Sequence, residues 1–218
     1  MAKAARIIGE RIRRPIADAV REAEEKTAAE FVPVIATNSD RYERAEDMAG
    51  LVVAIISLVV VSWLFGMREG VVQPLVVLAL ILAVLTGFIA GVLLAVQIAP
   101  LRRLFISPTR RFTAVAARAR QVFVDRKVHQ TTGGTGIVLY VSLFEGAGMV
   151  LADQAVRDHL PEGALDDLSR SLTHGIASGD VGTALVATIA ELGNRLGDVL
   201  PRYEDDVNEL PDALVLLD

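Results

Sequence analysis

Two long apolar runs, separated by a single pair of charges, constrain this chain more than any other feature. Between residues 48 and 101 the only charged residues are Arg68 and Glu69, which leave one apolar run at 48–67 and another at 70–101. At a rise of about 1.5 Å per residue, each run can cross a hydrocarbon core roughly 30 Å thick. Neither run has a polar face with which to meet water, so we expect a transmembrane hairpin rather than buried core helices.

The rest of the 218-residue chain suffices for one soluble domain and not for two. We expect the first part of this domain at 1–47, the hairpin at 48–101, the remainder of the domain at 102–212 and a short tail at 213–218. Cysteine is absent, which excludes disulfides, thiol nucleophiles and thiolate metal sites.

Charge asymmetry around the apolar runs predicts the orientation. The basic residues at 1–14 are not followed by the apolar segment of a cleavable signal peptide. The loop between the two apolar runs has a single basic residue, Arg68. By the positive-inside rule, we expect a protein of the cytoplasmic (inner) membrane with both termini and the soluble domain in the cytoplasm. The arginines that favour this orientation are Arg41, Arg44, Arg102, Arg103, Arg110, Arg111, Arg118 and Arg120. Those after the second run are equally consistent with contacts to anionic lipid headgroups and with a solvated helix face.

The soluble segments alternate between helical and strand patterns. Before the hairpin, an amphipathic helix is predicted to begin near Arg14 or to bend there because of Pro15, and a strand follows at 31–37. Pro33 lacks a backbone donor, which favours an edge strand or a bulged one. The apolar stripe of the helix consists of Ile8, Ile12, Ile16, Val20 and Ala23.

After the hairpin, Ser107 is predicted to cap a helix that continues to about Val128. Strands at 137–143 and 149–152 then form a hairpin, and two further helices follow, the second capped by Asp180. The glycine-rich segment TTGGTG at 131–136 lacks the lysine of a P-loop and precedes its strand, so we interpret it as a flexible loop rather than a phosphate cradle.

Carboxylates are the candidate metal ligands. His129, His159 and His174 share no spacing suited to metal ligation. Oxygen ligands suit Ca²⁺ or Mg²⁺, and the candidates are Asp153, Asp205, Asp206, Asn208, Glu209 and Asp212. Two alternatives remain open: a solvated acidic tail, and a structural role in which Asn208 and Asp212 cap or turn the chain while the apolar residues 214–217 dock on the domain or on a partner.

Four stretches resemble the TPM domain family, in the subgroup whose domain is interrupted by a two-span hairpin. They are AEEKTAAEFVPVIA at 23–36, ARQVFVDRKVHQTTGGTGIVLYVSL at 119–143, VLADQAV at 150–156 and NELPD at 208–212. The resemblance implies an α/β fold, a small mixed sheet flanked by helices. Members of the family are described as phosphatase-like, calcium-binding or assembly factors for membrane complexes.

Two functions follow as hypotheses. The preferred one is a membrane-anchored, non-enzymatic module for protein interaction or assembly at the cytoplasmic face of the membrane, since no catalytic constellation is recognised. The alternative is a phosphatase-like hydrolase that depends on a divalent metal. The expected partners are membrane lipid and an unidentified protein, without nucleic acid. Homo-oligomerisation is left open, because Gly87 and Gly91 form a small-residue pattern that permits close helix contact.

Overall fold

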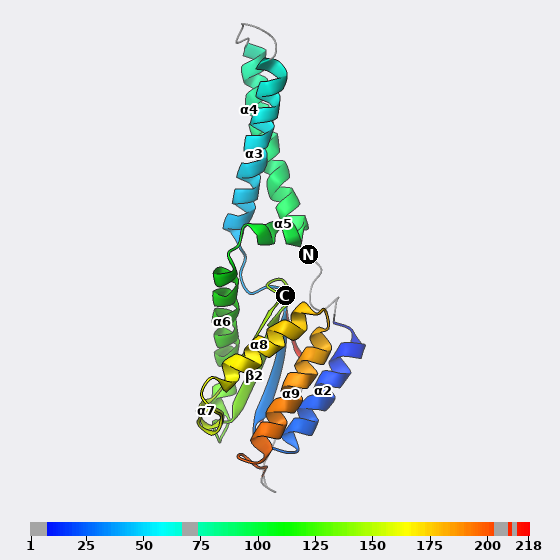
Figure 1. Cartoon of the computed structure of the whole chain (residues 1–218), viewed down its shortest axis with the longest axis vertical. Coiled ribbons are helices and arrows are strands. Elements are labelled where there is room, and N and C mark those ends of the chain that lie inside the picture. The colour runs from blue at the N-terminus through cyan, green and yellow to red at the C-terminus, as the bar shows by residue number, and fades with distance from the viewer. Residues whose placement is uncertain (1–7, 67–73, 203–208, 211–212) are drawn as a thin grey trace. The chain divides into compact units, whose positions relative to one another are not determined.

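The computed structural model describes residues 8–66, 74–202, 209–210 and 213–218 (Figure 1). Two compact units are distinguished within the chain. The hairpin unit comprises residues 41–110, and the sheet unit comprises the described residues before 41 and after 110. The hairpin unit is therefore inserted between two segments of the sheet unit.

A mixed four-stranded sheet organises the sheet unit. Its strands are β1 (Glu30–Ala36), β2 (Gly136–Ser142), β3 (Ala147–Ala152) and β4 (Val215–Leu217), in the order β3-β2-β1-β4. Strand β1 pairs in parallel with β2 and with β4, whereas β2 and β3 form an antiparallel hairpin. The predicted fold class, a small mixed sheet flanked by helices, is confirmed.

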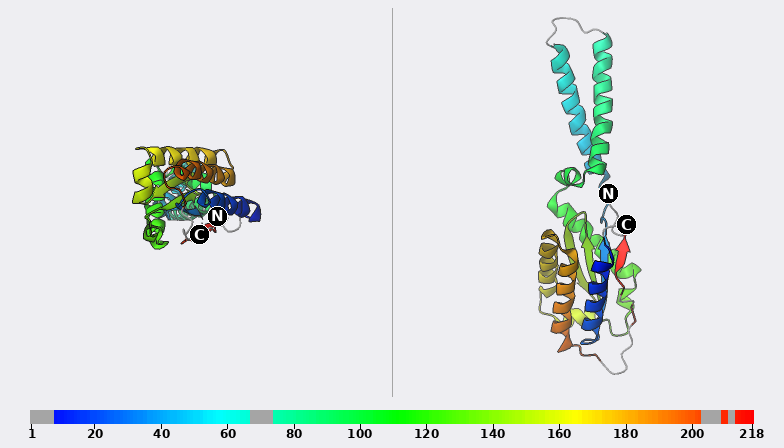
Figure 2. Two further views of the ribbon diagram at one scale, coloured as in Figure 1. Left: turned by 90° about the horizontal axis from the view of Figure 1, so that it is seen from below. Right: turned by 90° about the vertical axis from the view of Figure 1, so that its right-hand side faces the viewer.

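Helices cover both faces of the sheet, as the alternation along β1 requires. Phe31 and Ile35 join the apolar core formed with α2 (Glu10–Glu24), α8 (Ala164–Ala177) and α9 (Val181–Gly197). Val32 and Val34 join a second core on the opposite face, formed with α6 (Pro108–Asp125) and the short 3-10 helix η1 (Val128–Gln130). All of β1 and β2 is buried because both faces are covered. The two views of Figure 2 show α8 and α9 side by side.

Of the two alternatives for the strand that contains Pro33, an edge strand or a bulged one, the edge position is wrong, since β1 lies between β2 and β4. Pro33 nevertheless fits in this strand, because the pairing of β1 with β4 does not include residue 33 and needs no N–H there. Thr37 donates its N–H to the carbonyl of Leu217 on β4 (2.9 Å). Every second residue of a strand directs its N–H to the same neighbouring strand, so position 33 faces the same way as Thr37. Pro33 therefore directs its missing donor toward the β4 side, where pairing begins only at Val34.

Local signals for helix ends are largely confirmed. Ser107 Oγ accepts the N–H of Arg110 (3.3 Å), and Asp180 accepts the N–H of Thr183 (2.9 Å). The hydroxyl and the N–H of Thr183 lower the pKa of Asp180. Pro15, in contrast, neither begins α2 nor lies next to its start, because the helix already begins at Glu10.

Several short elements were not predicted, among them two in the sheet unit. The short helix α7 (Gln154–His159) follows β3 directly, and the apolar end of the chain forms β4. The tail therefore completes the sheet of its own domain, which is the first of the two docking alternatives for residues 214–217.

The hairpin unit consists of α3 (Glu43–Gly66), α4 (Pro74–Gln97) and the short α5 (Ala99–Leu104). Helices α3 and α4 are long and apolar enough to cross a membrane, and most of their large side chains face outward, among them Trp63 and Leu75. Their glycines bring the two helices together: a Cβ on Gly91 would lie 2.8 Å from the carbonyl oxygen of Ala49. Gly87 and Gly91 are buried within the hairpin, so their small surface is used inside one chain.

Candidate functional site

Two of the six predicted metal ligands lie among the described residues, and the carboxylate of each accepts a hydrogen bond from a backbone N–H. Asp153 Oδ1 accepts the N–H of Gln154 (2.7 Å) as the N-cap of α7. The carboxylate of Glu209 accepts the N–H of Thr132 (3.0 Å). The other four, Asp205, Asp206, Asn208 and Asp212, lie outside the described residues.

Asp153 and Glu209 both contact the glycine-rich loop that precedes β2. Glu209 binds it at Thr132, and a Cβ on Gly134, which has φ +63°, would lie 3.8 Å from Asp153 Oδ2. A third carboxylate, the buried Glu30, accepts the N–H groups of Glu209 (3.1 Å) and of the following residue (3.3 Å). Within the described part of the chain, no three His, Cys, Asp or Glu side chains are grouped so as to hold a metal ion. Glu209 therefore ties the loop to the C-terminal segment, Glu30 ties that segment to β1, and Asp153 caps α7.

The three histidines have different surroundings. His159 Nδ1 lies 2.7 Å from the carbonyl oxygen of Ala155 in its own helix, and the His129 ring lies 6.3 Å from that of Phe123. His174 lies on α8 at the surface hollow described below.

A buried polar network occupies the carboxyl ends of β1 and β2, where open α/β sheets often bind ligands. The carboxylate of Glu145 accepts the hydroxyl of Ser142 and the N–H of Ser39 (2.9 Å). The Ser39 hydroxyl lies 3.0 Å from the hydroxyl of Tyr140. Burial raises the pKa of Tyr140 to about 12, so the phenol stays neutral at physiological pH. The network joins the turn of the β2–β3 hairpin to the segment that leaves β1, and its groups bind one another.

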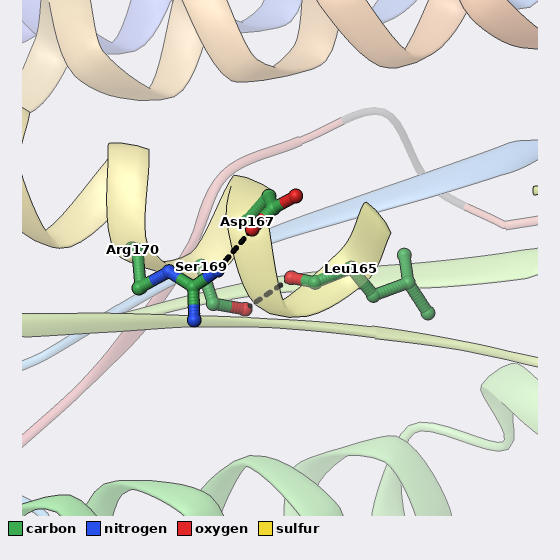
Figure 3. Close-up of polar contacts among 4 residues, drawn as sticks. All are labelled: Leu165, Asp167, Ser169 and Arg170. Atoms are coloured by element: carbon green, nitrogen blue, oxygen red, sulfur yellow. Dashed lines mark hydrogen bonds and ion pairs between the residues drawn. The ribbon is translucent and has the colours of Figure 1, made fainter. Parts of the chain in front are cut away.

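The outer edge of β3 is covered by hydroxyl groups of α8. Ser169 Oγ accepts the N–H of Val150 (2.9 Å), and Thr173 Oγ1 accepts the N–H of Gly148 (3.0 Å) and donates to its carbonyl (3.2 Å). Ser169 in turn donates to the carbonyl of Leu165 (2.7 Å), as Figure 3 shows. The unpaired N–H and carbonyl groups of a sheet edge can bind another strand, and here the side chains of α8 bind these groups instead.

A surface hollow of about 470 Å³ lies along this covered edge, between α8 and α6. Its size is within the range of ordinary ligand pockets. Its apolar lining residues include Phe112 of α6, which has half of its surface exposed, Met149 of β3 and Ala177 of α8. Its polar lining residues are Asp166, Ser169, Arg170, Thr173 and His174. Arg170 forms an ion pair with Asp167 within α8 (Figure 3).

A second hollow adjoins the first and shares Met149 and Asp166 with it. It continues past β3 to the loop that precedes α8, and Arg120 and Arg157 are among its charged lining residues. We call the two hollows together the β3-edge groove. A hollow lined by both apolar and polar residues suits the insertion of apolar side chains from a binding partner.

Sequence reasoning did not identify this groove. Ser169 and Thr173 lie one turn apart on α8, which was the available signal, but hydroxyl groups at helical spacing are common on solvated faces as well. Half of the surface of Phe112 is exposed, which its position in the sequence does not indicate.

The chain is similar in fold to the BA42 protein of the psychrophilic bacterium Bizionia argentinensis. The NMR structure of that protein aligns with a TM-score of 0.57 and 16% identity, over 99% of this chain and 99% of that chain. At this identity the likeness concerns the fold alone. No family model and no curated protein matches the chain. Membership of the TPM family therefore stays a prediction.

Proposed function

We propose that this protein is a membrane-anchored, non-enzymatic module whose sheet unit binds a partner protein through the β3-edge groove. The observation that carries the proposal is the half-exposed Phe112, which lines a hollow together with other apolar and with polar residues. Aromatic side chains at the centre of such surfaces often contribute much of the binding free energy. The hairpin supports the membrane part of the proposal, since both of its helices are long enough to span a bilayer.

The partner contributes side chains rather than a strand. Adding a strand to β3 would require free N–H and carbonyl groups along its outer edge. The N–H groups of Gly148 and Val150 are already bound by Thr173 and Ser169. An apolar side chain between Phe112 and α8 requires no such groups, and it leaves the α8 hydroxyls in place.

The arginines around the apolar runs support a cytoplasmic location for both termini and the sheet unit. The absence of cysteine allows a direct test with single-cysteine variants and a membrane-impermeant thiol reagent. Arg68→Cys, between the two runs, is expected to be labelled from outside intact cells. Asp18→Cys, at an exposed position of α2, is expected to be labelled only after the membrane is opened. The reverse pattern would overturn the orientation.

Site-specific photocrosslinking in native membranes tests the binding role. The photoreactive residue p-benzoylphenylalanine replaces Phe112 in one variant and Val124, another exposed apolar residue of α6, in the control. Val124 is not among the residues that line the groove. We expect a discrete crosslinked protein from position 112 that is absent from position 124 and is reduced by Thr173→Trp, which fills the groove.

Identical products at both positions, or none at position 112, would refute the proposal. So would turnover of a phosphate ester by the purified protein that requires added Ca²⁺ or Mg²⁺ and is lost in the double variant Asp206→Ala, Glu209→Ala. That result would establish the hydrolase alternative instead.

A further inference from the structure

The short helix α5 begins immediately where the second apolar helix ends. Only Ile98 separates the last residue of α4 from the first of α5, and its backbone is extended (φ −108°, ψ 92°). The hydrogen bonds continue through this break, since Ile98 donates to the carbonyl of Leu94 (2.9 Å) and Arg102 donates to that of Ile98 (3.2 Å). In Figure 1, α5 lies across the base of the hairpin. If α4 spans a membrane, α5 therefore lies at the surface of that membrane.

The rotation of α5 about its axis is set by Arg102. This side chain is only 6% exposed, and its Nη2 lies 2.9 Å from Glu46 Oε1 at the start of α3. Its guanidinium also lies 5.8 Å from the centre of the buried Tyr42 ring, and the guanidinium of Arg110 lies 5.7 Å from the same ring. These contacts direct the Arg102 face of α5 toward the start of α3.

The opposite face of α5 is apolar and exposed. At 3.6 residues per turn, the residues two positions before and after Arg102 lie on the far side of the helix. They are Pro100 and Leu104, and both are exposed. Leu104 is 80% exposed, the largest exposed fraction among the large apolar side chains that the structure describes. A leucine held outward in this way would be unfavourable in water.

We infer that α5 is an interfacial helix, with Pro100 and Leu104 inserted at the boundary between lipid headgroups and acyl chains. The inference rests on the membrane anchoring in the proposed function and adds a second contact with the bilayer. The continuity of α5 with α4 favours lipid over a protein partner, because the same membrane surface is already next to the helix. Interfacial helices of this kind bury their apolar face in the headgroup and acyl boundary while their polar face stays outside it.

The absence of cysteine allows the depth of α5 to be measured in the full-length protein reconstituted into phospholipid vesicles. The environment-sensitive fluorophore NBD is attached at Leu104→Cys and, as a second position on the same face, at Pro100→Cys. Leu93→Cys, exposed on α4, is the reference for a position inside the bilayer, and Asp18→Cys on α2 is the reference for water. Quenching is measured with aqueous iodide and with nitroxides attached to the lipid at the headgroup or deep in the acyl chain.

At positions 100 and 104 we expect headgroup nitroxides to quench more strongly than deep nitroxides. Iodide quenching there is expected to be several-fold weaker than at position 18. Position 93 is expected to respond most to the deep nitroxide.

Three outcomes would overturn the inference, and they differ in what else they affect. Iodide quenching at 100 and 104 equal to that at 18, with 93 still deep, would leave the anchor intact and place α5 in water. Protection at 100 and 104 from both iodide and every lipid nitroxide would mean that protein covers the helix. Exposure of position 93 to iodide would refute the membrane anchor itself and, with it, the interfacial position of α5.

Discussion

The contact between α2 and α9 depends on the absence of one side chain. Gly193 of α9 packs against Ala23 of α2, and a Cβ added at Gly193 would lie 2.8 Å from the Cβ of Ala23 and 3.0 Å from its Cα. Carbon atoms in favourable contact are about 3.5–4.0 Å apart, so Gly193→Ala must push the two helices apart by up to about 1 Å. Neither atom of Ala23 can move away by a rotamer change.

Two opposing effects determine how much Gly193→Ala changes the free energy of unfolding. Overpacking a core contact costs about 1–3 kcal/mol. Replacing glycine by alanine inside a helix returns about 1 kcal/mol through helix propensity. We therefore expect Gly193→Ala to lower the free energy of unfolding of the sheet unit by about 1 kcal/mol.

Gly197, one turn later on the same helix, provides the matched control. A Cβ there would lie 3.4 Å from the carbonyl oxygen of Lys26 and 3.5 Å from its Cβ, which are ordinary contacts. Gly197→Ala should be neutral or slightly stabilising. The difference in unfolding free energy between the two variants removes most of the propensity term and should amount to about 1–3 kcal/mol.

Pulse proteolysis in urea suits this measurement in detergent micelles. The single tryptophan, Trp63, lies in α3 and reports on the hairpin unit, so its fluorescence would not follow the sheet unit. Intact protein that survives a brief protease pulse at each urea concentration gives the unfolding midpoint. Unfolding free energies of the two variants within about 0.5 kcal/mol of each other would refute the packing argument.

Three further changes test the polar contacts of the sheet unit. Burial raises the pKa of Tyr140 to about 12, so the wild type should keep the stability that Tyr140 contributes below about pH 10 and lose it as the pH rises toward 12. Tyr140→Phe should remove this loss and should cost about 1 kcal/mol at neutral pH, because the hydrogen bond with Ser39 is lost. Urea unfolding across a pH series measures both effects. Ser169→Ala leaves the buried N–H of Val150 without its acceptor and should lower the free energy of unfolding by about 1–3 kcal/mol. Amide hydrogen exchange at Val150 should become faster. Unchanged exchange would contradict the proposal that α8 protects the outer edge of β3. Glu30→Ala removes the acceptor of two N–H groups in the C-terminal segment and should accelerate exchange in β4 while leaving β3 unaffected; equal acceleration in both strands would indicate a general loss of stability instead.

Much of the fold could be predicted because its signals are local. A helix that crosses a bilayer needs about 20 apolar residues, and few other structures tolerate such a run. The β2–β3 hairpin has a glycine with positive φ in its turn, Gly146, and the caps of α6 and α9 depend on side chains that bind N–H groups within one turn. Each of these interactions is determined within a few neighbouring residues.

The errors concern contacts between segments far apart in the sequence. Pro33 favours an edge strand or a bulged one, but β1 pairs with β4, which comes from the other end of the chain, and this pairing begins at Val34, one residue after Pro33. Gly87 and Gly91 permit close helix contact, and the structure shows that α3 of the same hairpin makes this contact, through Ala49 and Gly50 at Gly91. Glu209 binds the N–H of Thr132, a contact over a long sequence separation, whereas Asp153 caps the helix that follows it directly. The metal site stays a prediction.

The sequence by itself determined the apolar hairpin, the strand and helix types and most helix ends, since these depend on composition and on interactions of short range. Only the tertiary structure decided the strand order, the cover of β3 by Ser169 and Thr173, and the outward position of Phe112 and Leu104. Whether an apolar side chain is buried or exposed depends on which elements pack against it. The physical reason is that packing joins residues far apart in the chain, and no local pattern specifies which of them meet.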